Sequence, residues 1–86
     1  MEASRRFEVH QQLGEGSFSK IFQAFDKKLK HLVALKVEKE DKHKKILKFE
    51  YEILKSLQGL PHVPRLYDFI ENEKGAIKFS SESNSK

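Results

Sequence analysis

A glycine-rich stretch near the N-terminus reads Leu13-Gly14-Glu15-Gly16-Ser17-Phe18-Ser19-Lys20-Ile21. It contains most of a G-x-G-x-x-G pattern, in which glycines let the backbone approach a phosphate while exposed N–H groups act as donors. The stretch is a weak signal when taken alone, because a plain hairpin turn also uses glycines. Its meaning depends on the elements that flank it.

Both flanks of this stretch favour β-strands. The segment from Phe7 to Leu13 alternates apolar and polar residues, and the segment from Lys20 to Phe25 is rich in aromatic and β-branched residues. A Rossmann loop would open a helix instead. A Walker loop needs a lysine directly after its last glycine, then Ser or Thr, and the sequence has neither. The remaining nucleotide-binding alternative is a glycine loop that joins two antiparallel strands.

A third strand is predicted from Leu32 to Glu38, and it contains V-A-L-K at positions 33–36. Residues on a strand alternate between its two faces. Val33 and Leu35 are therefore expected to point into the core, and Ala34 and Lys36 toward the glycine loop. A small residue leaves room for a flat ring, and an ammonium beside it can meet phosphates. The alternative is that Lys36 is an ordinary solvated lysine at the edge of a sheet.

The segment from Lys45 to Leu57 changes to helical periodicity. One narrow stripe of the predicted helix carries Ile46, Glu50, Ile53 and Leu57, with Phe49 and Leu54 on either side. Glu50 is thus expected in the middle of an apolar face, where a carboxylate is costly to bury unless it is paired. Lys36 is its natural partner, whereas Glu52 points away from the stripe. Gly59 and the prolines that follow end the helix.

The remaining segments complete an α+β fold, with an antiparallel sheet of four to five strands and one main helix. A fourth strand is predicted from Arg65 to Glu71, a turn at Asn72-Glu73-Lys74-Gly75, and the start of a fifth strand from Ala76 to Phe79. We expect a flexible N-terminus over residues 1–6, a single domain over 7–79, and a disordered serine-rich tail over 80–86.

Composition limits the other classes of function. The 86 residues are 37% hydrophobic and contain no cysteine, which excludes disulfides and thiolate metal sites. The four histidines lack ligand spacing, so no metal site is predicted. No apolar run is long enough to span a membrane and no signal-peptide pattern is present, so we expect an intracellular protein, cytoplasmic or nuclear.

Positive charge is concentrated in residues 27–48, which contain nine lysines and three acidic residues. A basic segment can bind nucleic acid, and steep salt dependence would then be expected. We favour a solvated face, because no aromatic residue interleaves the lysines from Lys36 to Lys45 as a base-stacking platform would require.

Glycine loop, strand lysine and helix glutamate, in that order, resemble the N-terminal lobe of the eukaryotic protein kinases from about Phe7 to Glu71. The resemblance implies ATP as ligand, with Mg²⁺ only in the complete kinase, and a protein substrate. It implies an ion pair between Lys36 and Glu50 that positions phosphates. It also implies a nucleotide site in which Leu13, Ile21 and Ala34 line the adenine. The residues of that site are Leu13, Gly14, Glu15, Gly16, Ser17, Phe18, Ser19, Ile21, Ala34 and Lys36.

Two further positions carry implications of the resemblance. Leu54 and Leu66 would belong to the hydrophobic spine that links the two lobes of a kinase. Within the kinases, Leu54-Lys55-Ser56-Leu57-Gln58-Gly59, followed by His62-Val63-Pro64, is similar to the casein kinase I group, which implies serine/threonine substrates.

The sequence departs from the kinase pattern in three ways. Ser19 replaces the third glycine, where a small residue should be tolerated. Asp68-Phe69 begins like the D-F-G metal motif but continues with Ile70, so we assign it to the fourth strand. The 86 residues contain no H-R-D-x-x-x-x-N loop, which supplies the catalytic base. We therefore expect a small lobe without the large lobe, and no phosphotransfer by this chain alone. The alternative is a noncatalytic module that binds a protein partner through its exposed apolar underside.

Overall fold

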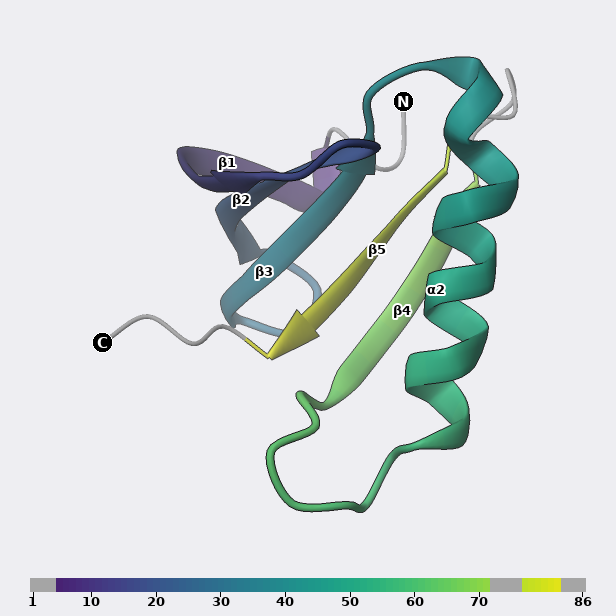
Figure 1. Cartoon of the computed structure of the whole chain (residues 1–86). Coiled ribbons are helices and arrows are strands. Elements are labelled where there is room, and N and C mark those ends of the chain that lie inside the picture. Colours follow the sequence, from purple (N-terminus) through teal and green to yellow (C-terminus); the bar gives the residue numbers. More distant parts are fainter. Residues whose placement is uncertain (1–4, 72–76, 83–86) are drawn as a thin grey trace.

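The structure is a computed structural model that describes residues 5–71 and 77–82, and within these ranges it contains one five-stranded sheet and one main helix (Figure 1). The elements, in chain order, are β1 (Phe7–Glu15), β2 (Ser19–Asp26), β3 (His31–Glu38), the 3-10 turn η1 (Asp41–His43), α2 (Lys44–Ser56), β4 (Leu66–Glu71) and β5 (Ile77–Glu82). The predicted fold class is confirmed. No helix among the described residues is both long and apolar enough to cross a bilayer.

The strands follow the order β1-β2-β3-β5-β4, and every neighbouring pair is antiparallel. The predicted meander of the first three strands is confirmed. β5 then enters between β3 and β4, so the last strand that the structure describes is an inner strand of the sheet (Figure 1).

Each face of the sheet has its own apolar cluster. On the face away from α2, a cluster is formed by Phe7, Ala24, Val33 and Leu35, with Val37, Tyr67 and Ile70 packed against it. On the face covered by α2, a second cluster is formed by Leu47, Ile77 and Phe79, with Tyr51, Leu54, Leu66 and Phe69 around it. The predicted alternation along β3 is confirmed, because Val33 and Leu35 are buried while Lys36 lies on the helix side beside Phe79.

The stripe predicted to be the apolar face of the helix is not the face that packs on the sheet. Ile46, Ile53 and Leu57 are 40%, 43% and 37% exposed, whereas Leu47 is buried. Two stripes overlap on this helix, because Glu50 is three or four residues from members of both. The sheet covers the stripe of Leu47 and its helical neighbours, since their side chains meet Phe79 and Ile77 of β5. Glu50 therefore lies at the border of the packed face.

Polar contacts hold the end of α2 against the start of β4. Gly59 has φ of +97°, a backbone conformation that glycine adopts without strain, and the helix ends before it as predicted. The Gln58 amide donates to the carbonyl oxygens of Leu54 (3.1 Å) and Pro64 (2.9 Å), and its oxygen accepts from the N–H of Leu66 (3.0 Å). One side chain thus joins helix, loop and strand.

The prediction of a disordered tail over residues 80–86 is wrong for residues 80–82. β5 continues to Glu82, and Ser80 is fully buried. A serine-rich sequence carries little apolar signal, but an inner strand is stabilised by backbone hydrogen bonds to β3 and β4 on both sides. The turn predicted at Asn72–Gly75 lies outside the described residues.

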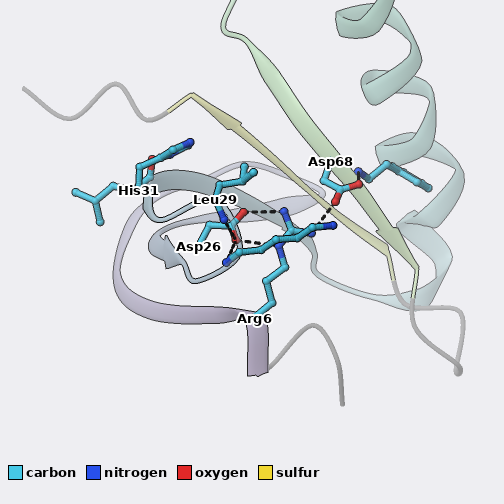
Figure 2. A network of polar contacts seen from close by, with 8 residues as sticks. Arg6, Asp26, Leu29, His31 and Asp68 are labelled. Carbon is cyan, nitrogen blue, oxygen red and sulfur yellow. Dashed lines mark hydrogen bonds and ion pairs between the residues drawn. The ribbon is translucent and has the colours of Figure 1, made fainter.

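Arg6 ties the start of the chain to two strands (Figure 2). Its guanidinium donates to both carboxylate oxygens of Asp26 (2.9 and 2.7 Å) and to Asp68 on β4 (2.6 Å). Asp26, fully buried, also accepts from the backbone N–H groups of Lys28 and Leu29 (2.9 and 3.2 Å). The predicted flexible N-terminus is therefore wrong at Arg6. The assignment of Asp68 to the fourth strand is confirmed.

Candidate functional site

The ammonium of Lys36 forms an ion pair with the carboxylate of Glu50. The lysine is on β3, where the register places it directly opposite Ile21 of β2 and Phe79 of β5. The glutamate is in the second turn of α2, which packs over β3, β4 and β5. The sequence reasoning predicted this pairing, and the structure brings the two residues together.

The environment of the pair is partly solvated. The Lys36 side chain is 21% exposed and the Glu50 side chain is 39% exposed. The Lys36 ammonium also lies 5.8 Å from the centre of the Phe79 ring, within the range of a cation–π contact. Two partners on different elements thus hold one ammonium, and a partly solvated face remains from which an anion can approach it.

The glycine-rich stretch forms the connection between β1 and β2. The N–H of Gly16 donates to the carbonyl oxygen of Ser19 (2.8 Å), which closes the turn. Ser19, in place of the third glycine, is buried at the start of β2, as its small side chain allows. The tip residues Ser17 and Phe18 are exposed, and a Cβ built on Gly14 would meet no atom within 4 Å. The space beside Gly14 is therefore open.

The residues predicted to line adenine lie on three adjacent strands. Ile21 faces Lys36 across the β2–β3 pair, and Ala34 lies two residues before Lys36 on the same face. Leu13 is on β1 and is 43% exposed. It precedes Gly14, which pairs with Ile21. α2 packs over the other half of the sheet, on β5 and β4 as well as β3. The roles of these residues in nucleotide binding stay predictions.

Glu15 has a partner that the sequence reasoning missed. Its carboxylate pairs with the ammonium of Lys39, just after β3. The hydrogen bond from Lys39 lowers the pKa of Glu15, and the positive charge of the lysine adds to this effect. Lys39 therefore holds the Glu15 carboxylate, and a role of Glu15 in nucleotide binding stays a prediction. Lys39 is one of many lysines in its segment, so the sequence carried no signal for it.

A metal site was not predicted from the sequence. Within residues 5–71 and 77–82, no group of three or more His, Asp or Glu side chains is arranged to hold a metal ion. Asp68 accepts a hydrogen bond from Arg6 (Figure 2).

Residues 7–83 match the family model described as the protein kinase domain. A probable serine/threonine-protein kinase of Dictyostelium discoideum is 38% identical over 60 residues, which is 70% of this chain and 12% of the relative. A second probable serine/threonine-protein kinase of that organism is 33% identical over 72 residues, covering 84% of this chain and 12% of the relative.

A probable myosin light chain kinase of Dictyostelium discoideum is 31% identical over 67 residues, covering 77% of this chain and 21% of the relative. The chain thus spans between about an eighth and a fifth of the length of these relatives. The matched segment includes the glycine loop, Lys36 and Glu50. The chain belongs to the protein kinase family.

Proposed function

We propose that this chain is the ATP-binding small lobe of a serine/threonine protein kinase. The ion pair between Lys36 and Glu50, on the sheet face that continues to the glycine loop, is the observation that carries the proposal. A lysine on this strand, paired with a helix glutamate, serves in kinases to hold the phosphates of ATP. ATP would supply the phosphoryl group that the complete protein transfers to serine or threonine of a protein substrate.

In this proposal each part of the site has a separate task. Lys36 offers a positive charge to the phosphates, and Glu50 keeps the lysine from turning into solvent. Accessible backbone around Gly14 and Ser17 provides N–H donors to the phosphate oxygens. Leu13, Ile21 and Ala34 provide an apolar surface for adenine. Magnesium is expected only in the complete kinase.

Titration of the 86-residue chain with a fluorescent ATP analogue tests this proposal. We expect a dissociation constant no lower than roughly millimolar, because the described residues provide one side of a nucleotide site. Lys36→Met should weaken binding further. Micromolar affinity would contradict the proposed incompleteness of the site, and undiminished binding by Lys36→Met would contradict the role of the lysine.

We also propose that this chain alone transfers no phosphate, because the 86 residues lack the catalytic-loop aspartate of protein kinases. The purified chain, incubated with ATP, Mg²⁺ and a mixture of protein substrates, should give no phosphorylation. Activity that Lys36→Met abolishes would contradict this proposal.

Within the family we propose membership of the casein kinase I group. The support is the sequence Leu54–Gly59 followed by His62-Val63-Pro64. In the structure this segment ends α2 and leads into β4 through the contacts of Gln58. Phosphorylation assays of the complete protein with casein and with myosin light chain, side by side, test the assignment. Preference for myosin light chain would contradict it.

A second candidate function is a noncatalytic module that binds a protein partner. The observation in its favour is the exposed stripe of α2, on which Phe49 is 67% exposed and Ile46 and Ile53 are about 40% exposed. Pull-down experiments with Phe49→Ser, and separately with Lys45→Ser and Lys48→Ser, distinguish an apolar from a basic contact. A partner lost only with Phe49→Ser would support this function, and the absence of any partner would contradict it.

A further inference from the structure

The tip of the glycine loop touches the residue at which α2 begins. The Phe18 ring lies edge-on to the His43 ring, with 5.1 Å between ring centres and 69° between ring planes. His43 is the last residue of η1 and the N-cap residue of α2. A side chain of the proposed nucleotide loop is therefore in direct contact with the helix that carries Glu50.

Two polar contacts join the same two segments. The backbone N–H of Lys39 donates to the carbonyl oxygen of Phe18 (3.0 Å). The Lys39 ammonium pairs with the Glu15 carboxylate on the other side of the loop. The loop is thus attached to the connection between β3 and α2 through its backbone, through a charge pair and through an aromatic contact, and Phe18 and Lys39 each take part in two of these contacts.

The burial of His43 indicates that the aromatic contact is more than a chance approach. His43 lies in the lysine-rich segment 39–45, yet it is only 9% exposed. Its Nδ1 atom has no hydrogen-bond partner among the described residues. A buried polar atom without a partner is destabilising, and packing of the ring must offset this cost. Phe18, itself 45% exposed, supplies one side of that packing.

We propose that Phe18 and His43 are positioning residues that couple the glycine loop to α2. When the loop shifts, the contact carries the displacement to the first turn of α2, and Glu50 lies in the next turn. A displacement at the Phe18–His43 contact then shifts the Lys36–Glu50 pair through α2, and a displacement of the pair shifts the contact. Only the identity of the ligand that moves the loop rests on the proposed function. The coupling between loop and helix is expected in the chain without any ligand.

Amide hydrogen exchange of the ligand-free chain, resolved by residue, tests the coupling. Phe18→Ala should raise the exchange rates of the α2 amides at residues 47–50 by roughly threefold to tenfold, the range expected for the loss of an aromatic pair. Phe18→Tyr keeps the ring and should leave these rates unchanged. His43→Ala should in turn raise exchange at the Gly16 amide, and His43→Phe should not.

Phe49→Ala is the matched control, because it removes an exposed phenylalanine ring from α2 itself. It should leave exchange at Gly16 unchanged. The proposal is contradicted if Phe18→Ala affects only the loop amides. It is equally contradicted if exchange rises uniformly, including β3 and β5 amides, because the effect is then general destabilisation.

A second arm adds ATP and follows backbone amide shifts. In the native chain, shifts at Gly14 and Gly16 should be accompanied by shifts at residues 44–48, and His43→Ala, which lies outside the proposed nucleotide site, should abolish only the latter. Shifts at residues 44–48 that survive His43→Ala would contradict the coupling. If no loop amide responds to ATP in any variant, the proposed nucleotide site is wrong, and the exchange experiment still decides the coupling.

Discussion

Lys36 and Glu50 are 14 positions apart in the sequence, and their side chains form an ion pair that connects β3 to α2. The lysine has a second contact with the ring of Phe79, its neighbour on β5. The pair thus spans the junction of sheet and helix, beside the apolar cluster that holds the two together. Its position suggests a stronger effect on ligand positioning than on stability.

Glu50→Gln is predicted to change the free energy of unfolding of the chain by less than about 1 kcal/mol, because the pair is partly solvated. In the complete kinase the same substitution should lower catalytic efficiency by roughly 100-fold, since a displaced lysine misplaces the phosphates. Chemical denaturation and steady-state kinetics measure the two effects. Glu52→Gln is the control, and equal effects of the two substitutions would argue against a special role for Glu50.

Asp26→Asn is predicted to destabilise the chain by about 3 kcal/mol at pH 7, because it leaves the Arg6 guanidinium without its main anionic partner. Burial alone would raise the pKa of Asp26, but the hydrogen bonds from Arg6, Leu29 and Lys28 together lower it below its ordinary value. The hydrogen bond to Asp26 in turn raises the pKa of Arg6.

The pH dependence follows from the lowered pKa of Asp26. A carboxyl group whose pKa is lower in the folded state stabilises the protein above its unfolded pKa, and that contribution is lost as pH falls through the folded value. The free energy of unfolding of the native chain should therefore decrease when the pH is lowered below about 4, and it should approach that of Asp26→Asn. Thermal unfolding between pH 2 and 7 measures this, with Glu71→Gln, at an exposed site, as control. A constant difference between native chain and Asp26→Asn would contradict the prediction.

Leu47→Ala is predicted to cost about 2–5 kcal/mol, because Leu47 is buried against Ile77 and Phe79. Ile53→Ala, on the exposed stripe, should cost about 1 kcal/mol or less. Urea denaturation of both variants compares the two stripes of α2. A larger loss of stability for Ile53→Ala than for Leu47→Ala would contradict this packing and would favour the face that the periodicity alone predicted.

Ser80→Ala is predicted to stabilise the chain by about 1 kcal/mol, because the buried Oγ of Ser80 has no hydrogen-bond partner in the described structure. Ser80→Asp should destabilise it, since an unpaired charge would enter an inner strand. Melting temperatures check both variants. If both substitutions left the melting temperature unchanged, Ser80 would not be buried in β5.

The sequence predicted the first four strands, the helix and the Lys36–Glu50 pair, because each depends on periodicity or on a local motif. It did not predict the inner position of β5, since Ser80–Glu82 owe their place to backbone pairing on both sides and not to apolar side chains. It selected the wrong stripe of α2, because Leu47 and Ile53 are equally apolar and only the sheet distinguishes them. Arg6 and Lys39 were missed because their partners are distant or lie across a loop.

Binding of ATP at the glycine loop and Lys36 can be tested by titrating ATP into the isotope-labelled 86-residue chain and following its amide resonances. We expect the amides of Gly14, Gly16, Ile21 and Lys36 to shift together, with a dissociation constant of roughly millimolar or weaker. Adenosine, which lacks phosphates, should shift Ile21 but not Gly16, and Lys36→Met should weaken the response to ATP. Absence of any shift at these residues at roughly 10 mM ATP, or an unchanged response in Lys36→Met, would contradict ATP binding at this site.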